Sequence, residues 1–298
     1  MGRALTLGYH LVNVFTRDGE RLSGNPLCVF EDAGALDAGR MQALARQFNL
    51  SETTFLLPPT TPAATHRVRI FTPDFEMPFA GHPTLGTAHV ARRIGVEASG
   101  RSVDVVTLEM TAGLIPVAAR GDLWTLSAGA PASAEVDDAG SPLAAALGLQ
   151  RADLRLEPGG ARPLWVDTGS NQLVVPLVDP DAVARVRPRL ELLERYRSPA
   201  GRRFAYVFAE VGDGDVVARF LFDADESMRE DPATGSACAN LGGWYLATGA
   251  TTPLVRRVLQ GDRIHRPSTL FLSVDAAGQV RVGGEVAWLG RGEITLDE

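Results

Sequence analysis

Lysine is absent from this chain of 298 residues, so all 29 basic residues are arginines. Without lysine the protein cannot form a pyridoxal-phosphate Schiff base and cannot use a lysine general base. The stretch "GHPTLGT" copies the glycine spacing of a nucleotide-binding phosphate loop, but Thr87 stands where that loop needs its lysine. Nucleotide binding of that type is therefore excluded.

Cysteine is also scarce. Cys28 and Cys238 lie far apart, with no C-x-x-C spacing, which favours reduced thiols over a disulfide framework or a zinc site. His82 and His89 are seven residues apart and belong to no H-E-x-x-H motif, so we expect no metal. No G-x-S-x-G motif points to a serine hydrolase.

Neither a secretory signal pattern nor a long apolar run occurs in the sequence. The net charge of −7 and the pI near 5.3 argue against a nucleic-acid groove or an anionic-membrane patch, because both need a clustered positive surface. We expect a cytoplasmic protein that binds neither nucleic acid nor membrane.

Two halves of the chain carry similar motifs. Aligning His82 with Asp231 places "HPTLGTA" over "DPATGSA", so that Gly86 matches Gly235, and the offset of 149 residues is half of the chain. "GNPLCV" and "SNQLVV" are a weaker echo of the same kind. This pattern predicts an ancient duplication and two similar domains.

The predicted architecture is α+β, with each half a mostly antiparallel, curled sheet around one central helix. The first domain is expected over residues 1–128, completed by a C-terminal strand at about 285–298, and the second over 129–284. The turn-rich residues 128–141 are a candidate linker. Helical patterns cover 36–50, 83–95, 141–149, 188–198 and 234–249. The helices at 83–95 and 234–249 lack a broad polar face, which is typical of buried helices.

Proline is favoured at the first position of a helix, so His82 and Asp231 are expected to cap helices that begin at Pro83 and Pro232. The backbone N–H groups and dipole at such ends attract carboxylates or phosphates. Asp is a common cap, and a lone His is more often structural than catalytic, so a purely structural role stays open for each. The pairing of the two positions through the repeat favours function.

Glu52, in "LSETTF", directly follows a predicted helix and opens a predicted strand. It could be an exposed strand-edge residue or part of a turn capped by Ser51. A glutamate withdrawn from water could instead take and return a proton near neutral pH.

Six motifs together resemble the PhzF-like phenazine-biosynthesis isomerase family, which has the diaminopimelate epimerase-like fold. They span the chain in the family's order: "SGNPLCVF", "LSETTF", "FEMPFAGHPTLGTA", "EDPATGSACANL", "VLQGDRIHRPS" and "VRVGGEVAWLG". The resemblance implies an active site between two domains, commonly in a homodimer, with no cofactor and no metal.

The resemblance also implies roles for individual residues. Glu52 would be the proton-shuttling acid/base, with His82 and Asp231 as further catalytic residues. Gly81, Gly235 and Ser236 would bind the substrate. Related racemases use two cysteines, but Ala80 and Pro232 occupy the matching positions here.

The resulting hypothesis is a cofactor-independent isomerase that moves a proton on a small carboxylate-bearing metabolite. Two alternatives remain open at this point. One is an epimerase or dehydratase acting on a hydroxy-amino acid, and the other is a non-catalytic protein that binds a small carboxylate. The sequence does not name the substrate.

Overall fold

The computed structural model describes residues 4–212, 214–224 and 227–297. By its internal contacts the chain divides into two compact units. Unit 1 comprises the residues up to Leu126 together with the segment from Gly283 onward, and unit 2 comprises Ser127–Val282. Each unit is described below by itself.

Unit 1 is built from strands that close around one helix. Its strands are β1 (Ala4–Val14), β2 (Asn25–Phe30), β3 (Thr53–Leu57), β4 (His66–Phe71), β5 (Glu76–Met77), β6 (Val105–Met110), β7 (Gly113–Arg120), β8 (Leu123–Ser127) and the C-terminal part of β17 (Val280–Asp297). β2 and β3 pair in parallel, as do β4 and β6, while the other neighbours are antiparallel. β17 also pairs with β8, so the sheet returns to its start.

The helix inside unit 1 is α2 (Gly81–Ser99), and every residue from His82 to Ala91 is buried. Small residues let the surrounding strands approach it. A Cβ added to Gly86 would come within 2.6 Å of Leu27 Cδ2 and 2.9 Å of Val14 Cγ2. Glycine is therefore required at this contact of α2 with β1 and β2.

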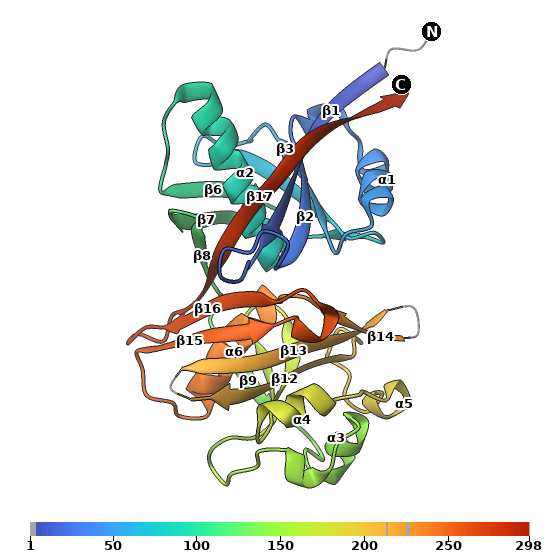
Figure 1. Ribbon diagram of the computed structural model, residues 1–298, viewed down its shortest axis with the longest axis vertical. Helices are drawn as coiled ribbons and strands as arrows, with labels where there is room; N and C mark the ends of the chain where they lie inside the picture. The colour runs from blue at the N-terminus through green and yellow to red at the C-terminus, as the bar shows by residue number, and fades with distance from the viewer. Residues whose placement is uncertain (1–3, 213, 225–226, 298) are drawn as a thin grey trace. The chain divides into compact units, whose positions relative to one another are not determined.

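A second apolar layer of unit 1 lies between the sheet and α1 (Ala38–Phe48), next to the short 3-10 helix at Ala33–Ala35. Asp37 caps α1 by accepting a hydrogen bond from the Arg40 N–H at 2.8 Å. Stacked and edge-on rings fill this layer, among them Phe30, Phe55 and Phe71. Figure 1 shows β17 running beside β1, and the pairing extends to Ala4 and Asp297.

Unit 2 repeats the plan of strands around a central helix. Its strands are β9 (Ala132–Glu135), β10 (Leu164–Asp167), β11 (Asn171–Pro176), β12 (Phe204–Val211), β13 (Asp215–Ala224), β14 (Ser227–Asp231), β15 (Leu254–Gln260) and β16 (Ser268–Val274). The pairs β11–β12 and β13–β15 are parallel, and the remaining neighbours are antiparallel. The central helix is α6 (Gly235–Ala247), which is buried from Ala237 to Tyr245.

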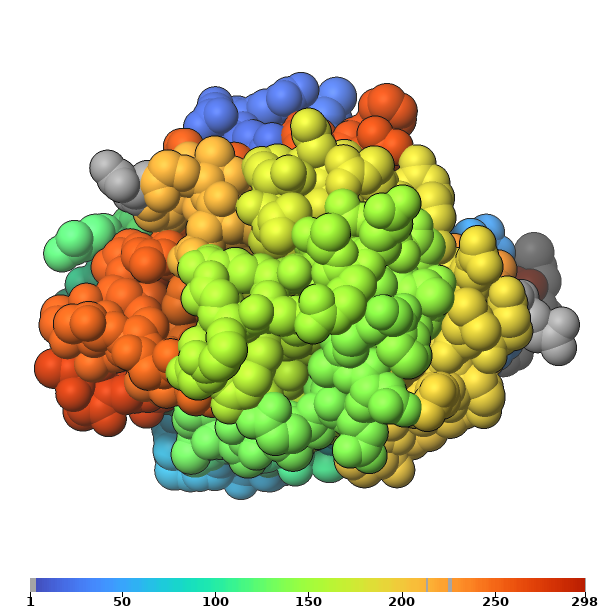
Figure 2. Space-filling model, turned by 90° about the horizontal axis from the view of Figure 1, so that it is seen from below, coloured from blue at the N-terminus to red at the C-terminus, as the bar shows by residue number. Residues whose placement is uncertain are grey.

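Three short helices give unit 2 an extra layer. α3 (Ser141–Ala146), α4 (Pro180–Arg185) and α5 (Leu190–Leu193) pack with β10–β13 around a separate apolar cluster. In Figure 2 the segments that contain these helices, coloured green to yellow, lie next to one another on one surface. Short 3-10 helices lie at Arg151–Asp153 and Asp262–Ile264.

The α+β architecture and the two buried central helices agree with the sequence prediction. The candidate linker is wrong in part, because residues 132–135 form β9, which pairs with β10. The sequence of this strand, Ala-Ser-Ala-Glu, gives little apolar signal, so a strand could not be predicted from it. No helix in the described part of the chain is long and apolar enough to cross a membrane.

Candidate active site

His82 lies at the start of α2, inside the helix rather than before it. The N-cap is Ala80, whose carbonyl accepts from the Thr84 N–H at 3.2 Å, and the helix begins at Gly81. The prediction that His82 caps a helix starting at Pro83 is wrong. Proline is tolerated throughout the first turn, because those N–H groups have no partner within the helix.

Asp231 lies farther from the start of α6 than the sequence predicted. It is the last residue of β14, where it pairs with Phe220, and the N-cap of α6 is Thr234. The expected helix start at Pro232 is therefore wrong. The two helices begin at Gly81 and Gly235, so the motif alignment and the helix starts differ in offset.

Glu52 and His82 meet in unit 1. Glu52 directly precedes β3, and its Oε2 lies 3.5 Å from His82 Nε2. The His82 side chain is 7% exposed and that of Glu52 is 16% exposed. This distance is at the long limit for a hydrogen bond. Glu52 is thus not an exposed strand-edge residue.

Burial keeps the His82 imidazole neutral. Desolvation lowers the pKa of His82 to about 3, while a hydrogen bond to the backbone of Pro26 opposes the shift. The amide nitrogen of Asn25 lies 3.5 Å from His82 Nδ1. Since Asn25 and Pro26 open β2, this strand holds one edge of the ring while Glu52 faces the other.

A buried hydroxyl pair fixes β3 against α2. Thr54 Oγ1 and Thr87 Oγ1 are 2.7 Å apart, and both side chains are fully buried. Thr54 follows Glu52 by two residues, and Thr87 lies on α2 after His82. This bond therefore holds the two elements that carry the Glu52–His82 pair.

Asp231 has its own partners in unit 2. The Thr234 hydroxyl donates to Asp231 Oδ2 at 2.5 Å, so the N-cap residue of α6 is tied to the end of β14. The side-chain amide of Gln260 donates to the Asp231 carbonyl at 2.9 Å and to Thr234 Oγ1 at 3.0 Å. Gln260, the last residue of β15, is fully buried and fixes this corner.

Ser236 is the second residue of α6, directly after Gly235. Gln172 on β11 donates from Nε2 to Ser236 Oγ at 3.0 Å. Asn240, also on α6, donates from Nδ2 to Gln172 Oε1 at 2.8 Å. Gln172 and Asn240 are buried, so Ser236 is held by an interior amide network.

The structure thus gathers the six predicted residues into two sets, one in each unit. Gly81, His82 and Glu52 lie together in unit 1. Asp231, Gly235 and Ser236 lie within one short stretch of unit 2.

Sequence reasoning missed the amide side chains that hold these sets: Asn25, Gln172, Asn240 and Gln260. Two signals were present. Asn240 is an amide inside an otherwise small and apolar helix, and Asn25 and Gln172 occur in the paired echo "GNPLCV" and "SNQLVV".

Neither cysteine carries the chemistry of a two-thiol racemase. Cys28 lies on β2 and Cys238 on α6, and both are fully buried. Desolvation raises the pKa of both thiols well above the usual range, so neither forms a thiolate near neutral pH. Among residues 4–212, 214–224 and 227–297, no group of three acidic, His or Cys side chains is arranged to hold a metal.

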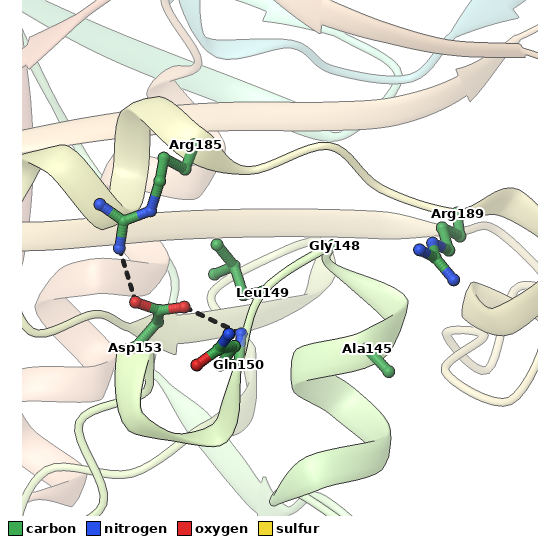
Figure 3. A pocket seen from close by; sticks show the side chains of 7 residues that line it. All are labelled: Ala145, Gly148, Leu149, Gln150, Asp153, Arg185 and Arg189. Carbon is green, nitrogen blue, oxygen red and sulfur yellow. Dashed lines mark hydrogen bonds and ion pairs between the residues drawn. The ribbon is translucent and has the colours of Figure 1, made fainter.

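An open hollow of about 600 Å³ in unit 2 lies apart from these residues. Figure 3 shows Arg185 bound to Asp153, with Arg189 on the opposite side. The Arg185–Asp153 distance is 2.6 Å, and Asp153 also accepts from the Gln150 N–H at 2.8 Å. None of the six predicted residues lines this hollow, so it is not the candidate active site.

Comparison with known proteins finds relatives over nearly the whole chain. The family described as phenazine biosynthesis-like protein matches residues 12–292. An uncharacterized isomerase of Pasteurella multocida is 38% identical over 290 residues, covering 96% of this chain and 93% of that protein. A trans-2,3-dihydro-3-hydroxyanthranilate isomerase of Pseudomonas aeruginosa is 33% identical over 299 residues, covering 97% and 99%.

Solved structures share the fold of this chain. A phenazine biosynthesis protein of the PhzF family from Bacillus anthracis superposes with a TM-score of 0.81 at 24% identity, covering 98% of this chain and 100% of that one. A solved hydroxyproline epimerase and a solved probable proline racemase share the fold as well. The chain is therefore an enzyme of the isomerase class with the diaminopimelate epimerase-like α+β fold. It belongs to the PhzF-like phenazine biosynthesis family, which confirms the resemblance found in its motifs.

Proposed function

We propose that the protein is a cofactor-independent isomerase that moves a proton on a small carboxylate-bearing metabolite, with Glu52 as the acid/base. The observation that carries this proposal is the mostly buried Glu52 carboxyl 3.5 Å from the neutral, buried imidazole of His82. A neutral imidazole adds no positive charge, and its nitrogens include both a donor and an acceptor. It is therefore a suitable partner for a carboxyl group that alternates between two protonation states.

The proposed reaction conserves all atoms. Glu52 removes a proton from a carbon next to an activating group, and the C–H electron pair shifts into the neighbouring unsaturated system. The resulting Glu52 carboxylic acid then returns the proton to another carbon of the same molecule. Positioned general acid/base groups of this kind contribute roughly 10²- to 10⁴-fold to rate.

The proposal assigns substrate binding to the helix starts. Backbone N–H groups near Gly81, Gly235 and Ser236 belong to first helical turns, where the helix dipole favours a carboxylate. His82 supports Glu52, and Asp231 is proposed as a further group in the proton chemistry.

The decisive experiment follows proton exchange in heavy water. Trans-2,3-dihydro-3-hydroxyanthranilate, the substrate in the name of the Pseudomonas aeruginosa relative, is the first compound to test, followed by other small carboxylates. Turnover and deuterium incorporation are measured by NMR for the unaltered protein and for Glu52→Gln. Glutamine keeps the size of the side chain and removes the base, so both signals should fall by 10²-fold or more, on the order of a lost acid/base group.

Glu31→Gln is the matched control. Glu31 Oε2 also lies 3.5 Å from a buried histidine nitrogen, His10 Nε2, but away from the first turn of α2. This variant should keep its activity within about twofold, as expected for a charge outside the site. A Glu52→Gln protein that exchanges deuterium as fast as Glu31→Gln would refute the proposal.

The proposed assembly rests on the family resemblance alone, whereas the expected location rests on the sequence pattern. A homodimer is proposed, and sedimentation equilibrium measures its mass directly. Cytoplasmic location stays a prediction, which fractionation of the producing cells would check.

A further inference from the structure

The buried amide network behind Ser236 has a fixed direction. Thr168 donates its backbone N–H to Asn240 Oδ1 at 2.9 Å, and a backbone N–H can act only as a donor. Asn240 Oδ1 is therefore the acceptor and Nδ2 the donor. The Ser170 carbonyl, which can only accept, lies 2.8 Å from Nδ2 and requires the same orientation.

The orientation of the Asn240 side chain determines that of Gln172. Since Asn240 Nδ2 donates to Gln172 Oε1 at 2.8 Å, the remaining polar atom of Gln172, Nε2, is a donor. Nε2 lies 3.0 Å from Ser236 Oγ, so the serine oxygen accepts. Backbone groups at Thr168 and Ser170 thus determine the role of a hydroxyl on another element, without any choice of amide flip.

The consequence concerns the hydroxyl hydrogen of Ser236. Because Gln172 occupies a lone pair of Oγ, the O–H is left to donate outside this network. Ser236 lies in the first turn of α6, where the helix dipole also favours negative charge. Both features suit an acceptor oxygen, such as one of a carboxylate.

We propose that Gln172, held in place by Asn240, is a positioning residue that makes the Ser236 hydroxyl a hydrogen-bond donor to an acceptor oxygen of the substrate. This inference rests on the proposed function, because it takes Ser236 as a substrate-binding residue. It specifies that Ser236 donates the hydrogen bond to the substrate. It also names Gln172 on β11 and Asn240 inside α6 as the residues that determine this direction.

The kinetic test replaces the hydrogen-bond donor of Gln172 with an acceptor. In Gln172→Glu the ionised carboxylate can only accept, so it should capture the Ser236 hydroxyl hydrogen. KM for trans-2,3-dihydro-3-hydroxyanthranilate should rise about 10- to 100-fold, the cost of one hydrogen bond to a charged group, with a smaller change in kcat. Ser236→Ala should raise KM similarly, and the double variant should add less than about twofold.

The pH profile separates positioning from a general structural defect. When the introduced carboxyl is protonated it regains a donor O–H, so the KM of Gln172→Glu should recover towards that of the unaltered protein as pH falls. Gln172→Met, which has a similar size and no donor or acceptor amide, should show no such recovery. Additive KM effects in the double variant, or equal pH profiles for the two Gln172 variants, would overturn the inference.

A measurement without substrate keeps the two proposals distinguishable. In ¹⁵N-labelled protein, Ser236→Ala should shift the side-chain NH₂ resonances of Gln172, which are identified by their loss in Gln172→Met. The resonances of Gln42, which donates to Thr72 and Pro73 carbonyls in unit 1, should stay in place. Unmoved Gln172 resonances would overturn the inference, whereas an unaltered protein inactive on every carboxylate would count against the proposed function.

Discussion

The first turns of α2 and α6 occupy the same place in their units but are supported by different chemistry. At α2, a titratable pair, Glu52 and His82, lies against Asn25 at the start of β2. At α6, Ser236 is held by Gln172 near the start of β11. Each unit therefore uses the opening of one strand to hold a side chain of its central helix. The proposed function places the Glu52–His82 acid/base pair in unit 1 and the neutral Ser236 contact in unit 2.

Asp231 tests whether unit 2 also takes part in proton transfer, and its substitution should have the largest effect on kcat. Asn keeps an acceptor for the Thr234 hydroxyl, so Asp231→Asn should fold normally while losing the charge. If Asp231 takes part in proton transfer, kcat should fall roughly 10²-fold or more. Steady-state kinetics checks this, with KM compared in parallel. An unchanged kcat with a raised KM would leave the proton chemistry to unit 1.

Acid should weaken α2 before α6. Desolvation lowers the pKa of His82 to about 3 and that of His89 to about 4, so the unfolded chain binds more protons below pH 6.5. Stability from these groups is complete above pH 6.5 and falls as the pH drops towards their folded values. Between pH 7 and pH 4.5 the loss is on the order of 2–3 kcal/mol for each histidine.

Hydrogen exchange with mass spectrometry measures this difference. Protection factors of α2 peptides should fall between pH 7 and pH 4.5 by a larger factor than those of α6 peptides. Arginine-paired carboxyls of unit 2, such as Glu135 and Asp215, titrate below this window because their partners lower their pKa values. His89→Gln, which retains an acceptor for Trp124 Nε1, should reduce the fall, and exposed His265→Asn serves as the control. Equal falls in both helices would contradict the prediction.

The smallest expected effects concern packing of the central helix. Gly86→Ala places a methyl group against Leu27 and Val14 and should lower the free energy of unfolding by about 1–2 kcal/mol, as overpacking offsets the gain in helix propensity. Gly95→Ala, on the same helix with nothing within 4 Å of the added Cβ, should raise it by about 0.5–1 kcal/mol. Urea unfolding of both variants tests the contrast, and a stabilised Gly86→Ala would show that the strands can move apart.

Much of the fold follows from local sequence signals. The two central helices carry few charges on any face until their ends, and this pattern predicted their burial. Their first residues could not be found in the same way. Proline is compatible with several positions at a helix start, so Pro83 lies inside α2 while Pro232 lies outside α6.

The candidate site was predictable in part. The motifs pointed to Glu52 and His82, and the side chains of these two residues lie 3.5 Å apart. The amides that orient Ser236 and Asp231 come from β11, β15 and α6, elements distant in sequence. Such contacts are set by strand register, which periodicity alone does not give.

The strand β17 leaves unit 2 at Val282 and supplies the last edge of unit 1, where it pairs along β1. On the ribosome, residues 4–126 therefore emerge long before the strand that completes their sheet. Unit 2 has nearly all of its residues by then and can fold first. Residues 4–126 therefore keep an open sheet edge until β17 has emerged, so unit 1 is completed only after the residues of unit 2 have been made.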